Sequence, residues 1–252
     1  MKALARKLVA MLPRELQNRI HYRNFPYYCP VCEIPILQWV PFGRGVGDGQ
    51  IRVEPELRLC PNCGSFERTR HFVLWLKKFK TLEGTPRFLH FAPERVFTEK
   101  LREALGTNYV TNDLFMENVD RHEDITAMSF GDDSFDFIYC SNVLEHVEDD
   151  ANAMKELYRV LAPGGTAIIQ VPIEGETTYE DPAITDPVER TKHFGQEDHV
   201  RYYGRDIQER LSSAGFQVRE FTMLDELKLS EKDIVRMNLD KEELIYECTK
   251  TS

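Results

Sequence analysis

The sequence predicts an α/β protein whose main part is built around a mostly parallel sheet. From residue 87 onward, short apolar runs typical of buried strands alternate with amphipathic helical patterns. The 252 residues, 42% of them apolar, suit one main domain and a smaller part. Two cysteine pairs ahead of residue 87 mark that smaller part. We therefore expect an N-terminal module followed by an α/β domain.

The charge of the chain is unevenly distributed. Residues 1–80 hold 14 Lys and Arg against 6 Asp and Glu, and the rest hold 18 against 36, for a net charge of -10. This asymmetry indicates two parts with different partners or two surfaces that attract each other. No apolar run reaches the length of a membrane span, and the first residues do not resemble a secretory signal. We expect a cytoplasmic protein.

Residues 1–25 are expected to form a helical segment. Leu4, Leu8, Met11 and Leu12 recur at helical spacing. Such a stripe packs on its own protein or lies on a membrane surface. We favour packing.

Four of the six cysteines form two Cys-x-x-Cys pairs separated by 27 residues, namely Cys29, Cys32, Cys60 and Cys63. Each pair can place two thiolates on one metal ion, and the glycine-rich residues 43–49 suit a hairpin turn that joins the pairs. Four thiolates leave no open position, so the sequence predicts a structural Zn²⁺. Two disulfides are the alternative, disfavoured in the cytoplasm. We assign residues 26–80 to this zinc ribbon and a following helix, and residues 81–252 to the α/β domain.

The elements of the α/β domain follow in order. Strands are expected at residues 87–91, 109–112, 135–140, 165–171, 216–221 and 243–248, and helices at 95–105, 150–162 and 204–214. A final antiparallel strand would explain why no full crossover helix precedes residue 243. Ligands of such sheets bind at the carboxyl ends of the strands.

Motifs at those strand ends carry a family resemblance. The spacings between three motifs match those of one protein family. The motifs are residues 135–136 (FD), 144–147 (LEHV) and 159–165 (RVLAPGG). The chain resembles the class I S-adenosylmethionine-dependent methyltransferases, in particular their small-molecule branch and a bacterial subgroup with an N-terminal zinc ribbon. The resemblance covers about residues 87–248. It implies a Rossmann-like seven-stranded sheet with a final antiparallel strand, and S-adenosylmethionine as cofactor.

The resemblance also implies which residues bind the cofactor. Asp113 would hold the ribose hydroxyls, with Leu114 beside it. Asp124 and Ile125 would meet the adenine, and Ser141 and Asn142 would flank the methionine portion. The alternative is that these polar residues only start turns or cap helices. Their occurrence at consecutive strand ends favours cofactor binding.

The first strand leads into a turn without glycine, formed by His90, Phe91, Ala92, Pro93 and Glu94. A pyrophosphate needs bare backbone nearby, so this turn disfavours NAD and FAD. S-adenosylmethionine has no phosphate, and Ala92 is small enough for close approach. Glu94 either contacts the ammonium or sulfonium group of the cofactor, or it is a first-turn acidic residue that interacts favourably with the helix dipole. We include His90, Phe91, Ala92 and Glu94 among the expected cofactor contacts.

Residues 173–203 form an insertion too long for a simple connection, which predicts a lid or substrate wall. Its second half concentrates imidazoles, acids and aromatic rings, so His193 and His199 are candidate general bases. His146 is a third candidate, after the fourth predicted strand. For each single residue, a structural role in a polar loop is the alternative.

The combination favours methyl transfer to an oxygen or nitrogen of a small molecule, such as a sugar or natural-product intermediate. An RNA methyltransferase that uses the basic zinc module to bind RNA is the first alternative. A catalytically inactive binding protein of this fold is the second, because the opening turn lacks the family's glycines.

Overall fold

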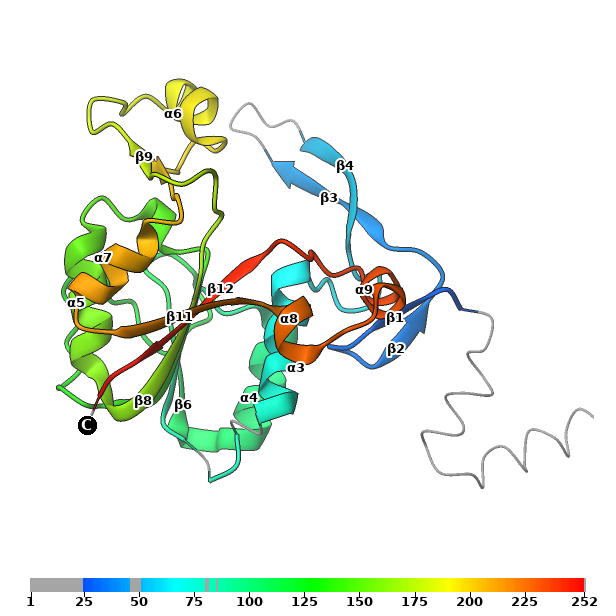
Figure 1. Cartoon of the computed structure of the whole chain (residues 1–252), viewed down its shortest axis with the longest axis horizontal. Helices are drawn as coiled ribbons and strands as arrows, with labels where there is room; N and C mark the ends of the chain where they lie inside the picture. The colour runs from blue at the N-terminus through cyan, green and yellow to red at the C-terminus, as the bar shows by residue number, and fades with distance from the viewer. Residues whose placement is uncertain (1–24, 46–50, 80–81, 85, 252) are drawn as a thin grey trace, which may run out of the picture.

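The computed structural model describes residues 25–45, 51–79, 82–84 and 86–251. The predicted N-terminal helical segment lies outside these residues except for Phe25, and so does most of the predicted glycine-rich turn. Within the described residues, no helix has the length and apolar character needed to cross a membrane. Figure 1 shows one large sheet flanked by helices, with two smaller hairpins at the N-terminal end.

The central sheet contains six strands in the order β11-β12-β8-β7-β5-β6 (Figure 1). Their bounds are β5 Phe88–Phe91, β6 Tyr109–Asn112, β7 Phe135–Ser141, β8 Leu161–Gln170, β11 Gln217–Thr222 and β12 Leu244–Thr249. Strands β5 to β8 pair in parallel, whereas β12 is antiparallel to both of its neighbours. The predicted α/β class and the final antiparallel strand are confirmed.

The sheet has six strands in the described residues instead of the seven that the resemblance implied. The chain between β6 and β7 forms turns, joined to β6 by one isolated bridge. A carboxylate oxygen of Asp120 accepts hydrogen bonds from the backbone N–H and the hydroxyl of Thr111, at 2.9 and 2.8 Å. The Asp120 side chain therefore satisfies a backbone N–H group at the edge of β6 to which a seventh strand would pair.

Two sets of helices cover the two faces of the sheet. One core cluster joins α5 (Asp150–Val160) and α7 (Ile207–Ser213) to the sheet. The other joins α4 (Arg95–Leu105), α8 (Met223–Leu227) and α3 (Glu67–Phe79) to the opposite face. Helix α4 has the predicted bounds. Helix α5 ends earlier than predicted because β8 already begins at Leu161.

The N-terminal module shares its core with the sheet through α3. Phe72 is fully buried, and its ring stacks on Tyr139 of β7 with centroids 3.5 Å apart. The module also contains two antiparallel hairpins, β1 (Tyr27–Cys29) with β2 (Ile34–Ile36) and β3 (Val40–Gly45) with β4 (Ile51–Leu59). The short helix α9 (Glu231–Met237) packs on β1. The division at residue 80 remains a prediction, but α3 belongs to the packing of both parts.

The insertion at residues 173–203 forms a small unit that stands beyond α5 and α7 (Figure 1). It contains β9 (Tyr179–Glu180), α6 (Pro187–Phe194) and β10 (Arg201–Tyr202), and β9 pairs with β10. The buried guanidinium of Arg201 donates hydrogen bonds to the carbonyl oxygens of Leu144 and Glu148, at 3.1 and 2.9 Å. The insertion is thereby tied to the segment that follows β7.

Candidate functional site

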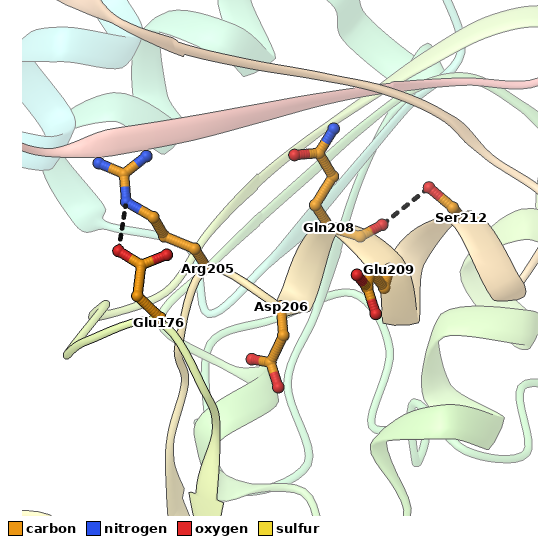
Figure 2. Close-up of a pocket in the computed structure, with 6 residues that line it drawn as sticks. All are labelled: Glu176, Arg205, Asp206, Gln208, Glu209 and Ser212. Atoms are coloured by element: carbon orange, nitrogen blue, oxygen red, sulfur yellow. Dashed lines mark hydrogen bonds and ion pairs between the residues drawn. The ribbon is translucent and has the colours of Figure 1, made fainter.

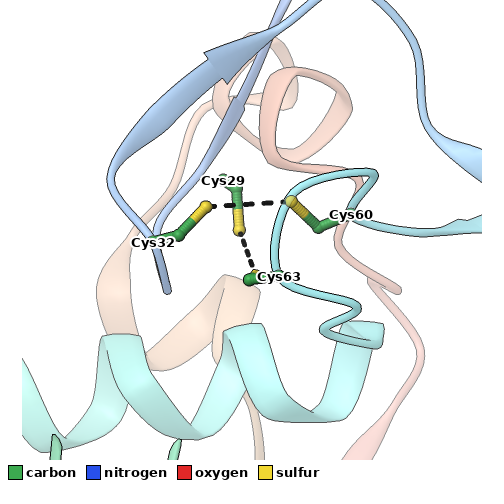
Figure 3. Close-up of side chains that lie close together, drawn as sticks. All are labelled: Cys29, Cys32, Cys60 and Cys63. Carbon is green, nitrogen blue, oxygen red and sulfur yellow. Dashed lines mark hydrogen bonds between the residues drawn. The ribbon is translucent and has the colours of Figure 1, made fainter. Parts of the chain in front are cut away.

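The four paired cysteines lie together, with their sulfur atoms within 4.8 Å of one another (Figure 3). The Sγ atoms of Cys29 and Cys63 are 3.7 Å apart, and those of Cys32 and Cys60 are 3.8 Å apart. A tetrahedral Zn²⁺ with bonds of about 2.3 Å requires sulfur atoms about 3.8 Å apart. The cluster is therefore compatible with a closed four-thiolate zinc site.

Each cysteine pair forms the same kind of backbone knuckle. Glu33 and Gly64, the residues directly after the second cysteine of each pair, have φ of 59° and 70°. Their N–H groups donate to the carbonyl oxygens of Cys29 and Cys60, at 2.9 and 2.8 Å. Because the sulfurs crowd one another, hydrogen bonds within the cluster lower the pKa of Cys29 and raise that of Cys60. A bound cation would let all four be thiolates.

The carboxyl ends of the parallel strands bring the predicted cofactor residues to one edge of the sheet. Phe91 is in register with Asn112, and the N–H of Ala92 donates to the carbonyl oxygen of Asn112 at 3.1 Å. Two strands away, the N–H of Asn142 donates to the carbonyl oxygen of Gln170 at 2.9 Å. The loops after β5, β6, β7 and β8 therefore begin side by side, where ligands of such sheets bind.

The two aspartates predicted to bind the nucleoside also hold their own turns. One carboxylate oxygen of Asp113 accepts from the backbone N–H groups of Phe115 and Met116, each at 2.8 Å. One oxygen of Asp124 accepts from the N–H and hydroxyl of Thr126, at 2.8 and 2.7 Å. Both aspartates thus perform the turn role named as the alternative, and their cofactor role stays a prediction.

The remaining predicted cofactor residues differ in accessibility. Phe91 and Ile125 are buried in the core, Ser141 is also buried, and Leu114 is exposed. Asn142 adopts a left-handed backbone conformation with φ of 54°. Leu114 and Asp124 are exposed, and Ala92, Glu94, Asp113 and Asn142 are partly exposed, so these six predicted residues present open surface at this edge.

His90 and Glu94 belong to a largely buried polar network under the strand ends. His90 is fully buried, and its Nδ1 lies 2.7 Å from the hydroxyl of Tyr109. A carboxylate oxygen of Glu94 lies 3.4 Å from His90 Nε2, and the other lies 3.7 Å from Nε of Arg68. Burial acts to raise the pKa of Glu94, but His90 and Arg68 outweigh it and lower that pKa. A cofactor role for this pair stays a prediction.

Several polar residues at this edge escaped the sequence analysis. The hydroxyl of Tyr139 donates to Oε1 of Gln170 at 2.9 Å, and Nε2 of Gln170 donates to Glu243 at 2.9 Å. Glu243 in turn lies 2.8 Å from Nδ1 of the buried His71. Tyr139 and Gln170 lie within runs of apolar residues that predict buried strands, so their polar atoms do not stand out in the sequence. The helix that carries His71 had been assigned to the other module.

Two of the three candidate catalytic histidines lie together. The rings of His146 and His199 have centroids 4.7 Å apart at an interplanar angle of 82°. His193 is exposed on α6, and its Nδ1 lies 2.7 Å from the hydroxyl of Tyr179. Glu145, which belongs to the LEHV motif but not to the predicted site residues, lies beside His146 and His199. The short helix that places Glu145 and His146 is the 3-10 turn Leu144–His146, directly after β7.

A cavity of about 570 Å³ lies elsewhere, on the outer side of α7 (Figure 2). It is lined by Glu176, Arg205, Asp206, Gln208, Glu209 and Ser212. Figure 2 shows the ion pair between Arg205 and Glu176, whose charged atoms are 3.8 Å apart. None of the lining residues directly follows a parallel strand, and none is a predicted site residue.

Comparison with known proteins places methyltransferases among the relatives of this chain. A family model described as a methyltransferase domain matches residues 62–169, which is less than half of the chain. Demethylmenaquinone methyltransferase of Streptomyces avermitilis is 46% identical over 46 residues, or 18% of this chain and 20% of that protein. The chain thus matches about a fifth of the length of this curated relative.

Solved structures resemble the chain over most of its length. The [4+2]-cyclase SpnF is 15% identical, with a TM-score of 0.50 over 75% of this chain and 84% of the other. A SAM-dependent methyltransferase from Archaeoglobus fulgidus is also 15% identical, with a TM-score of 0.49 over 74% and 95%. The likeness to the first shows a shared fold. The family match supports a class I S-adenosylmethionine-dependent methyltransferase.

Proposed function

We propose that this chain binds S-adenosylmethionine and transfers its methyl group to an oxygen or nitrogen of a small-molecule acceptor. The observation that carries the proposal is the alignment of the loops after β5, β6, β7 and β8 at one edge. The methyltransferase family model matches residues 62–169, which include β5, β6, β7 and all of β8 except its last residue. Fold alone does not specify this chemistry, because the similar SpnF structure is that of a cyclase.

The cofactor would lie across Ala92, Asp113 and Asn142, with the ribose beside the oxygen of Asp113 that its own turn does not use. The acceptor would enter next to His146 and His199, where the insertion meets the segment after β7. Methyl transfer needs in-line placement of nucleophile and methyl group with water excluded, and the insertion supplies a wall for that purpose. We assign the four-cysteine cluster to a structural Zn²⁺ that holds the N-terminal module.

Binding of S-adenosylhomocysteine tests this proposal without knowledge of the acceptor. At 100 times its dissociation constant, the ligand should add about 2.7 kcal/mol to the free energy of unfolding, measured by thermal denaturation. Asp113→Ala should weaken binding by about 10-fold or more, because a ribose hydrogen bond to a charged group is lost. Asp181→Ala is the matched control, since Asp181 caps an exposed turn of the insertion in the same way.

The control variant should bind as tightly as the natural chain. Absence of any thermal shift with S-adenosylhomocysteine or S-adenosylmethionine, in a folded and zinc-loaded sample, would refute the proposed function.

A further inference from the structure

Glu145, His146 and His199 form a second cluster of metal-ligating side chains, distinct from the four cysteines. One carboxylate oxygen and one nitrogen from each imidazole lie within 4.8 Å of one another. Glu145 and His146 come from the turn after β7, whereas His199 comes from the insertion. The backbone brings these segments together, because the N–H of Val200 donates to the carbonyl oxygen of Glu145 at 2.9 Å.

Both imidazoles are oriented by hydrogen bonds on their Nδ1 side. Nδ1 of His199 lies 3.0 Å from the carbonyl oxygen of Phe194, and Nδ1 of His146 lies 3.2 Å from that of Asp198. A carbonyl oxygen only accepts, so in the neutral form of each imidazole Nδ1 carries the proton and Nε2 carries the lone pair. Histidines that bind metals in proteins are held in the same way, by a hydrogen bond from the other ring nitrogen.

The carboxylate of Glu145 indicates that the cluster binds a ligand. The residue is 1% exposed, and neither carboxylate oxygen has a hydrogen-bond partner among the described residues. Asn142 lies near it without forming a well-directed hydrogen bond. An unpaired buried carboxylate is costly, and in proteins such groups are paired or bind metals. Burial raises the pKa of Glu145 to about 7.

We propose that Glu145, His146 and His199 bind a divalent transition-metal ion of the zinc type, in a site separate from the four-cysteine cluster. Two imidazole nitrogens and one carboxylate oxygen are the ligand set of metal sites that keep open positions for a reactant. The His146 side chain is 32% exposed, so the cluster faces solvent on one side. The open positions therefore take an oxygen-donor ligand from solution.

The role of the ion rests on the proposed function. An acceptor hydroxyl that binds the ion loses its proton to solvent more readily, because the cation stabilises the oxyanion. The oxyanion then forms the new oxygen–carbon bond while the sulfur–carbon bond of S-adenosylmethionine breaks, and neutral S-adenosylhomocysteine leaves. The acceptor class would be a molecule with a hydroxyl group that can ligate a metal.

Cobalt titration of the zinc-loaded full chain tests the site. Loosely held metal is first removed with a moderate chelator, and Co²⁺ is then added while its visible absorption bands are recorded. We expect one equivalent of Co²⁺ with the spectrum of nitrogen and oxygen ligands, without the sulfur charge-transfer bands of a cysteine site. Glu145→Gln and His199→Gln should each weaken Co²⁺ binding by about 100-fold.

His193→Gln is the matched control, because His193 belongs to the same insertion but not to the cluster, and it should bind Co²⁺ as the natural chain does. Circular dichroism verifies that each variant is folded. If the natural chain binds no Co²⁺ up to about 1 mM, or Glu145→Gln binds it equally well, the site is refuted. S-adenosylhomocysteine binding, measured on the same metal-depleted samples, reports separately on the proposed function.

Discussion

Ala92 is a residue whose backbone conformation favours glycine. Its φ is 48°, in the left-handed region, at the turn from β5 into α4. A Cβ in this conformation costs about 1 kcal/mol relative to glycine. The turn without glycine therefore keeps the backbone path of a glycine turn and stores a small strain at the expected cofactor edge.

Replacing this residue tests that strain. Ala92→Gly should raise the free energy of unfolding by about 1 kcal/mol, measured by denaturant titration. Ala104→Gly, at an exposed position of α4, should instead lower it by about 1 kcal/mol, because glycine is unfavourable in a helix. Equal destabilisation by both variants would contradict the assignment of strain to Ala92.

Glu94 is a residue at which opposing electrostatic effects can be separated by pH. Burial acts to raise its pKa, yet His90 and Arg68 bring the pKa below its ordinary value of 4.5. A lowered pKa in the folded state means that the charged form stabilises the fold. That contribution is present above about pH 4.5 and is lost as the pH falls through the folded-state pKa.

We therefore expect Glu94→Gln to destabilise the chain by about 1 kcal/mol at pH 7. The difference from the natural chain should shrink as the pH falls below 4.5, as measured by thermal unfolding across a pH series. A difference that grows on acidification would show that the sign of the pKa shift is wrong.

At the scale of elements, the proposed zinc ion would join the two cysteine knuckles and so hold β1 to β4 together. After a moderate chelator has removed loosely held metal, Cys60→Ser should retain much less than the one equivalent of zinc assigned to the cysteines. It should also lower the midpoint of thermal unfolding, since metal binding supplies folding free energy to such modules. Cys140→Ser is the control, because Cys140 is buried in β7 outside the cluster. That variant should retain its zinc, as measured by elemental analysis of the purified chain.

At the scale of the whole molecule, α3 makes the N-terminal module and the α/β domain one packing unit. Phe72 lies against both Tyr139 of β7 and Phe97 of α4, with ring centroids 3.5 and 5.3 Å apart. Its buried ring faces the sheet, whereas the exposed end of α3 carries Phe79. Loss of the module would expose the apolar face of the sheet.

Phe72→Ala should therefore cost about 3–5 kcal/mol of folding free energy, measured by denaturant unfolding. Phe79→Ala is the matched control on the same helix, because that ring is 41% exposed, and it should cost less than about 1 kcal/mol. A spectroscopic signal from the zinc module and one from the sheet should change together, in a single unfolding transition. Separate transitions would contradict a shared core.

The sequence predicted the order and type of the strands because buried strands have a local apolar pattern. The residue patterns predicted the six strands of this sheet, whereas the family resemblance implied a seventh. In the described residues, Asp120 bonds to Thr111 at the edge of β6 in place of that further strand. The sequence pattern assigned α3 to the N-terminal module but did not predict that this helix also packs on the sheet. Local periodicity reports which face of a helix is apolar but not which distant surface that face covers.

The sequence by itself determined the four-cysteine cluster and the set of polar residues at the strand ends. Both follow from short spacings, since a Cys-x-x-Cys pair and a strand end are local features of the chain. Only the tertiary structure joined Glu145 and His146 to His199, more than fifty residues later in the sequence. That contact depends on how the insertion folds back onto the turn after β7, and long-range packing of this kind leaves no local pattern.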